Sequence, residues 1–127
     1  PLVDRILPAG KRCGILTISS ATLTEMHLEK AGCQLDTPIG GTKESGEFCQ
    51  TIINNRLELD IDLARQENIT AAKSLVENNP DLGAILLECT NMIPFAADIR
   101  NATGLPVFSI YNLVCWFQQG LVPRQSF

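Results

Sequence analysis

Apolar and polar positions along the chain form blocks that predict a strand followed by a helix, repeated four times. Short continuous apolar runs are typical of strands buried on both faces of a parallel sheet. Longer segments with apolar residues three or four positions apart are typical of amphipathic helices. The predicted strands are 13–19, 33–39, a run from Gly83 that stops at Cys89, and 105–110. The predicted helices are 22–31, 47–53, 59–78, 94–102 and 111–121.

This order of elements predicts an α/β fold with a four-stranded parallel sheet. Consecutive parallel strands are joined by right-handed crossovers, and the helices then cover both faces of the sheet. Pro38 has no amide hydrogen to donate, which places the second strand at an edge. We therefore expect the strand order 2-1-3-4 in a flavodoxin-like sandwich. Residues 1–12 read as a linker or helix end, and residues 13–127 as a single α/β domain.

Several turn residues fix the expected boundaries of these elements. Thr22 and Glu25 have the spacing of a capping box, and Gly32 suits the position that follows a helix. The segment 40–46 (GGTKESG) reads as a loop that is long enough to suspect a function. Its spacing matches neither GxxxxGK[ST] nor GxGxxG, so we do not predict a phosphate-binding loop.

The most informative stretch runs from Gly83 to Pro94 (GAILLECTNMIP). The apolar run delivers Cys89 to the carboxyl end of a central strand, and Asn91 is placed to cap the helix that follows. Open α/β sheets bind ligands in the crevice at this edge, and the start of a helix favours the thiolate form of a cysteine. A cysteine in such a position is more often a packing residue than a catalytic one. Position alone therefore makes Cys89 only a candidate.

Composition and charge narrow the class of protein. The 127 residues fit one domain, and a hydrophobic content of 45% indicates a folded chain. The net charge of −4, with no dense stripe of Lys and Arg, argues against a nucleic-acid surface. No apolar run approaches the roughly 20 residues of a membrane span, and no signal peptide opens the chain, so we expect a cytoplasmic protein without membrane contact. Five cysteines without a CxxC pair fit neither a disulfide framework nor a zinc site, which favours reduced thiols and no metal.

The carboxyl ends of the first, third and fourth strands should lie along one edge of the sheet. That edge would carry one thiol surrounded by hydroxyl and amide groups, which suits a small carboxylate bound by backbone amides at the helix start. The residues placed there are Thr17, Ser19, Ser20, Cys89, Thr90, Asn91, Ser109, Tyr111 and Asn112.

Other reactive residues fit structural roles better. His27, the single histidine, lies within an amphipathic helix and suits the surface. Cys13 lies at the opposite edge of the sheet, and we expect Cys115 to be buried in the last helix. Burial is also favoured for Cys33 and Cys49. The acidic residues at the start of the long helix suit its dipole better than a metal; they are Glu58, Asp60 and Asp62.

Several segments resemble the second half of the aspartate/glutamate/hydantoin racemase superfamily. They are 87–96 (LECTNMIPFA), 103–108 (TGLPVF), 10–17 (GKRCGILT) with Leu23, Thr24 and Leu28, and 78–84. The resemblance covers nearly the whole chain, and Cys89-Thr90-Asn91 is its most specific part.

This resemblance implies two similar α/β domains that face each other, each contributing one cysteine. One thiolate removes the α-proton of a carboxylate or amino-acid substrate, the other thiol returns a proton on the opposite face, and no cofactor is needed. By this analogy Cys89 is one of the two acid/base residues. Thr90 and Asn91 would bind the substrate carboxylate, with Thr17 and Ser19 as weaker candidates.

The chain departs from that pattern because the motif of the first cysteine is missing. We consider a fragment of a longer enzyme, a natural single domain that dimerises, and a remnant without activity, and we favour the fragment. Single-cysteine relatives decarboxylate arylmalonates, so two readings stand beside the racemase: such a decarboxylase, and a non-catalytic carboxylate-binding or interaction domain. The substrate stays open among hydantoins, aspartate, glutamate and arylmalonates. If half of the enzyme is missing, apolar surface should be exposed and promote self-association, around Leu2, Val3, Trp116 and Phe117.

Overall fold

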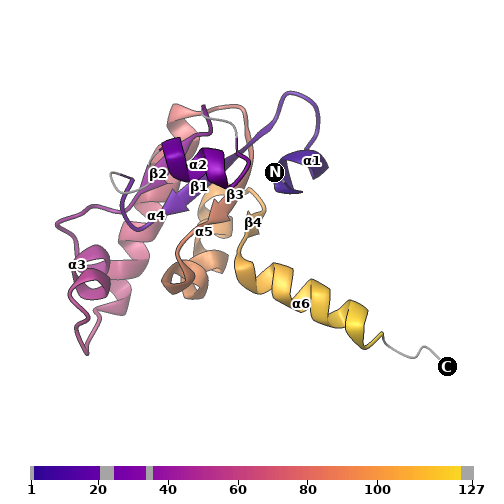
Figure 1. The fold of residues 1–127 in the computed structure, drawn as a ribbon. Helices are drawn as coiled ribbons and strands as arrows, with labels where there is room; N and C mark the ends of the chain where they lie inside the picture. Colours follow the sequence, from indigo (N-terminus) through magenta and orange to yellow (C-terminus); the bar gives the residue numbers. More distant parts are fainter. Residues whose placement is uncertain (1, 21–24, 34–35, 124–127) are drawn as a thin grey trace.

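Four parallel strands form one sheet in the centre of the molecule (Figure 1). The computed structural model describes residues 2–20, 25–33 and 36–123. The strands are hydrogen-bonded in the order β2-β1-β3-β4, and all three pairs are parallel. This confirms the predicted α/β class and the order 2-1-3-4, with β2 at an edge. The strands are β1 (Arg12–Thr17), β2 (Ile39–Gly41), β3 (Leu82–Leu87) and β4 (Val107–Phe108).

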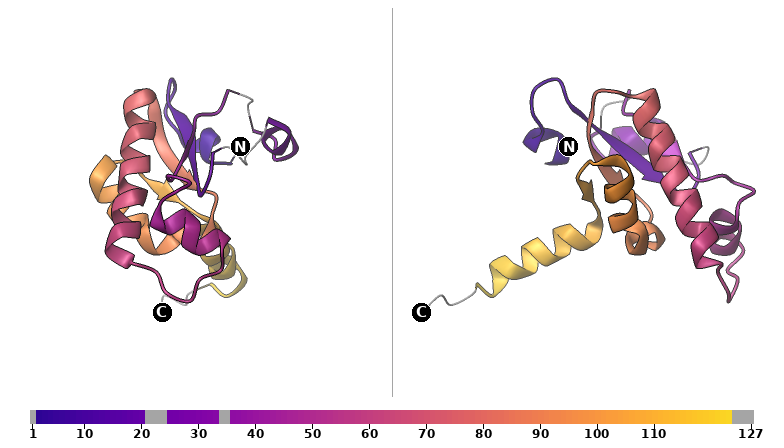
Figure 2. Two further views of the ribbon diagram at one scale, coloured as in Figure 1. Left: turned by 90° about the vertical axis from the view of Figure 1, so that its left-hand side faces the viewer. Right: turned by 180° about the vertical axis from the view of Figure 1, so that it is seen from behind.

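Helices lie on both faces of the sheet. Figures 1 and 2 show α4 (Ile61–Asn78) and α5 (Ala96–Thr103) on one face and α2 (Glu25–Lys30) on the other. The last helix, α6 (Ile110–Leu121), projects away from the sheet (Figure 1). The remaining helical segments are α1 (Leu2–Ile6), α3 (Glu47–Ile53) and the 3-10 helix η1 (Thr90–Phe95). Among the described helices, none is long and apolar enough to cross a membrane.

The main core lies between the sheet and α4. Small residues on α4 let the helix approach the strands closely, and the buried stripe is Ala64, Asn68, Ala71, Ala72 and Leu75. The spacing of apolar residues along this helix predicts that Leu63 also belongs to the stripe, which is wrong because Leu63 is 48% exposed. The stripe is set by the alanines, whose small side chains face the sheet, and Leu63 lies outside it.

Predicted helix ends are confirmed where they depend on glycine. Gly32 has a φ of 73° after α2, and Gly104 has a φ of 72° after α5. Both values lie in the left-handed region that glycine adopts without strain. After α2, the Cys33 amide donates to the Leu28 carbonyl at 2.8 Å, which completes a Schellman motif. The capping box expected at Thr22 lies outside the described residues, as does the side chain of His27.

The second strand lies later in the chain than predicted. Only Ile39 of the described part of 33–39 belongs to β2, which continues into Gly40 and Gly41, residues expected to begin a loop. Close packing explains this difference. A Cβ on Gly40 would lie 3.2 Å from the Leu75 Cβ, and a Cβ on Gly41 would lie 2.5 Å from the Ser20 backbone nitrogen. The two glycines therefore let the edge strand pass close to its neighbours.

Two further expectations are wrong, one at the start of η1 and one on α6. Asn91 does not cap a helix, because η1 already begins at Thr90 and Cys89 occupies the capping position without a side-chain hydrogen bond. Cys115 is only partly buried, and α6 contains no buried residue. The reason is that α6 points away from the sheet (Figure 1), so no other described element packs against it and buries its side chains.

Replacing Gly41 by alanine should destabilise the domain by about 1–3 kcal/mol, because the new methyl group would overlap backbone atoms of Ser20. Urea unfolding of the wild type and the variant measures this difference. Gly120→Ala is the matched control, since nothing described lies within 4 Å of the added Cβ. Equal losses in both variants would contradict the packing role of Gly41.

Candidate functional site

Cys89 lies two residues after Leu87, the last residue of β3, at the carboxyl edge of the sheet. It occupies the capping position of η1, and its carbonyl accepts a hydrogen bond of 3.1 Å from the Met92 amide. Its side chain is partly buried and packs against the main core. Met92 is fully buried in the main core and anchors η1 there. The structure therefore holds Cys89 on fixed backbone while leaving part of it accessible.

A hydrogen bond between Thr17 and Glu88 joins the ends of β1 and β3 next to Cys89. The Thr17 hydroxyl donates to Glu88 Oε2 at 2.8 Å, and the Glu88 amide donates to the Leu16 carbonyl at 2.9 Å. Thr17 is 2% exposed, whereas Glu88 is exposed. A buried hydroxyl thus fixes a surface carboxylate one residue before the thiol.

A second carboxylate lies beyond the end of β1. The Ser19 hydroxyl donates to Glu44 Oε1 at 2.6 Å. The loop that carries Glu44 is tied to the same edge, because the Thr42 hydroxyl donates to the Ile18 carbonyl at 2.7 Å. Gln50 also donates through Nε2 to the Glu44 carbonyl at 2.6 Å. The suspected functional loop therefore reaches the edge of the sheet where Cys89 lies.

The predicted site residues divide into two groups. Thr17 and Ser19 are buried and donate to carboxylates of the protein itself. Thr90 and Asn91 are exposed at the start of η1, beside Cys89 in the chain. Sequence reasoning missed Glu88 and Glu44. Glu88 was signalled only by its position before Cys89, and Glu44 by its place in a glycine-rich loop.

Ser109 and Asn112, also expected at this edge, form hydrogen bonds with each other. The amide and the hydroxyl of Ser109 donate to Asn112 Oδ1 at 2.9 and 3.2 Å. This arrangement caps α6. Tyr111 is exposed, and a hydrogen bond with Cys115 raises the pKa of its phenol. These residues therefore serve the start of α6.

The buried cysteines differ from Cys89 in their surroundings. Burial, reinforced by the negative charge of Asp4, raises the pKa of the Cys13 thiol to about 11. Burial and the carboxylates of Glu44 and Glu67 also raise the pKa of Cys49. A raised pKa keeps a thiol protonated, and only the thiolate reacts rapidly with alkylating reagents.

Iodoacetamide at pH 7.5 should therefore label Cys89 at least tenfold faster than Cys13 or Cys49. Peptide mass spectrometry after short exposure reads the labelling of each cysteine separately. Labelling in urea is the control, because unfolding should make the rates of the cysteines similar. Faster labelling of Cys13 than of Cys89 in the folded protein would contradict the burial described above.

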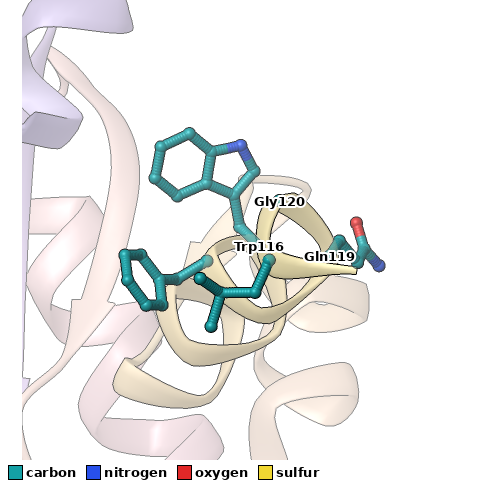
Figure 3. A pocket seen from close by; sticks show the side chains of 5 residues that line it. Trp116, Gln119 and Gly120 are labelled. Carbon is teal, nitrogen blue, oxygen red and sulfur yellow. The ribbon is translucent and has the colours of Figure 1, made fainter. Parts of the chain in front are cut away.

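Two other features bear on what the site can bind. Among the described residues, no group of three or more His, Cys, Asp and Glu side chains could hold a metal ion. A shallow apolar depression of about 480 Å³ lies on α6, lined by Trp116, Phe117, Gln119, Gly120 and Leu121 (Figure 3). It contains no titratable side chain and lies on a different element from Cys89. We therefore do not assign it to the chemistry of the thiol.

Comparison with known proteins gives one informative similarity. No family model matches the chain. A dimethylsulfoniopropionate lyase from Durusdinium sp. clade D is 38% identical over 69 residues, which is 54% of this chain. The match covers 23% of the lyase, so the chain spans about a quarter of the length of this curated relative.

Proposed function

We propose that this chain is part of a cofactor-independent enzyme in which Cys89 moves a proton at the carbon next to a substrate carboxylate. This is the chemistry of the racemase superfamily that the sequence resembles. The observation that carries the proposal is the position of Cys89: partly accessible, on fixed backbone, at the carboxyl end of a central strand. Ligands of open α/β sheets bind at this edge.

The proposed roles follow from what each group can donate. The Cys89 thiolate removes the proton, and negative charge then develops on the carboxylate oxygens of the substrate. Hydrogen-bond donors aimed at those oxygens stabilise this charge. Thr90 and Asn91 are exposed at the start of η1 and supply such donors from their side chains. They are our candidates for carboxylate binding.

The two carboxylates at this edge point to a second feature of the substrate. Glu88 and Glu44 are each oriented by a buried hydroxyl. The negative charges of Glu88 and Glu44 repel a second anionic group on the substrate and attract a cationic one. An amino acid carries both an ammonium group and a carboxylate. Its carboxylate can accept from Thr90 and Asn91, and its ammonium group can lie near the two glutamates. In this proposal Thr17 and Ser19 position the glutamates and do not touch the substrate carboxylate.

The curated relative favours a second candidate, an elimination. Its name gives a lyase for dimethylsulfoniopropionate, a molecule with a carboxylate at one end and a cationic sulfonium at the other. Removal of the proton next to the carboxylate, followed by loss of the leaving group on the adjacent carbon, needs only one base. A single cysteine therefore suffices for elimination, whereas racemisation requires a proton donor on the opposite face.

Proton exchange in deuterated water tests the shared first step. The chain, and separately a longer protein that contains it, are incubated with aspartate, glutamate, hydantoins, dimethylsulfoniopropionate and an arylmalonate, and the α-proton signal is followed by NMR. Loss of the signal with formation of the other enantiomer identifies a racemase, and acrylate with dimethyl sulfide identifies a lyase. An arylmalonate that releases carbon dioxide identifies a decarboxylase. The absence of exchange and of product in both proteins would overturn the proposal and leave the non-catalytic binding domain.

A further inference from the structure

The helix α6 exposes an apolar surface that no described part of the chain covers. Trp116 is 69% exposed, Phe117 61% and Leu121 66%. The helix contains no charged residue, and its polar side chains are amides and the tyrosine hydroxyl. Its other exposed apolar residues are Ile110, Leu113 and Val114. Such a helix is normally covered by another apolar surface.

A complementary surface lies on the face of the sheet opposite α4. Leu86 and Phe108 are register partners on β3 and β4, so their side chains project from the same face. Ile85 and its partner Val107 project from the other face and pack in the main core. Leu86 and Phe108 are only partly buried. Figure 1 shows α2 over the β1–β2 side of this face, with the short helix α1 to the right of β3.

We propose that two copies of the chain exchange α6, each helix covering the β3–β4 face of the other copy. We call this face, formed by Leu86 and Phe108, the acceptor face. Parallel sheets are normally covered on both sides, and a helix that follows the last strand is the natural cover for this one. Figure 1 shows that α6 begins just after β4 and points away from the sheet, so its exposed apolar side chains are free to reach a second copy. Exchange of an identical element between two copies is a low-cost route to a dimer.

The size of the surface supports a stable dimer. A fully covered aromatic side chain buries about 150–250 Å², so the exposed apolar part of α6 is on the order of 700 Å². Two exchanged helices would bury roughly 1,400 Å² on the helix side alone, within the range of specific protein interfaces. The lack of charge on α6 removes repulsion between the two copies at this interface. This inference does not depend on the reaction proposed for Cys89.

Sedimentation equilibrium and the fluorescence of Trp116 test the dimer. Trp116 is the only tryptophan of the chain, so its emission reports on α6 alone. We expect a dimer at micromolar concentrations, with the emission shifting to longer wavelength on dilution as the helix becomes exposed. Replacing both Trp116 and Phe117 by serine should raise the dimer dissociation constant at least about 30-fold. Leu57→Ser is the matched control, since Leu57 is fully exposed in the loop before α4 and should change nothing.

Mixing two defective variants distinguishes exchange from other modes of association. One variant carries Trp116→Ser and Phe117→Ser on α6, and the other carries Phe108→Ser on the acceptor face. In an exchanged heterodimer, the intact α6 of the second variant meets the intact acceptor face of the first. The mixture should therefore associate at least tenfold more tightly than either variant alone. Leu86→Ser replaces Phe108→Ser if circular dichroism shows that the latter is unfolded.

Each alternative outcome overturns the proposal. A wild-type chain that stays monomeric at 100 μM would exclude the exchange. Constant blue-shifted emission in a monomer would mean that α6 folds back on its own sheet. A dimer whose variants do not rescue one another would mean that the two α6 helices pack on each other. Loss of the dimer leaves the proton-exchange assay readable in the monomer, so the two proposals fail separately.

Discussion

The Phe48→Ala variant is expected to lose about 3–5 kcal/mol of unfolding free energy, the largest loss we predict for a single side chain. Phe48 lies on α3 and is fully buried. Its ring meets Phe95 edge to face, with centroids 5.9 Å apart and planes at 86°. Removal of the ring deletes this contact and leaves a cavity that the surrounding helices fill only in part. Urea unfolding should show a lower midpoint with an unchanged slope.

The matched control for Phe48 is Ile53→Ala on the same helix. Ile53 is 60% exposed, so its truncation should cost less than about 1 kcal/mol. Phe95 is the last residue of η1, the element that holds Cys89 at its start. Phe48→Ala should therefore also loosen η1 and raise the labelling rate of Cys89 under native conditions. An effect no larger than that of Ile53→Ala would contradict the central place of the Phe48–Phe95 pair.

The sheet could be predicted from the sequence because its central strands are continuous apolar runs that can be recognised locally. The run from Leu82 to Leu87 is apolar at nearly every position, as expected for a central strand of a parallel sheet. The start of α3 at Glu47 was also predicted correctly, although its cap was not. Glu67 of α4 accepts hydrogen bonds from the Glu47 and Phe48 amides at 3.1 and 3.0 Å. That partner lies about twenty positions away, so no local pattern reveals it.

The remaining differences have the same origin in non-local contacts. Gly40 and Gly41 look like turn residues, and only their fit against Leu75 and Ser20 shows why they form a strand. The apolar sequence of α6 predicts burial, but it does not say which molecule provides the cover. At the candidate site, the sequence indicated Cys89 and its neighbours in the chain. The pairing of Thr17 with Glu88 spans 71 positions and needed the fold.

The Cys89→Ser variant should reduce α-proton exchange by 10²–10⁴-fold, the range typical of a lost general acid/base. A serine hydroxyl keeps the size and can donate a hydrogen bond, but it does not ionise near neutral pH as a thiol can. Substrate binding should therefore change little, and the loss should lie mainly in kcat. Cys115→Ser is the matched control, because Cys115 is also partly accessible but lies on α6, away from β3. Full exchange in Cys89→Ser would remove Cys89 as the base.

A Glu88→Gln variant separates the role of the carboxylate from that of the thiol. Glutamine keeps an acceptor for the Thr17 hydroxyl, so the bridge between β1 and β3 can persist while the charge is lost. If Glu88 attracts a cationic group, KM should rise about tenfold for a substrate with an ammonium or sulfonium group and stay unchanged for an uncharged analogue, while kcat is kept. An equal loss for both substrates would assign Glu88 to the structure of the edge. Because Cys89→Ser acts on kcat and Glu88→Gln on KM, the pair tests whether this edge both binds the substrate and moves its proton.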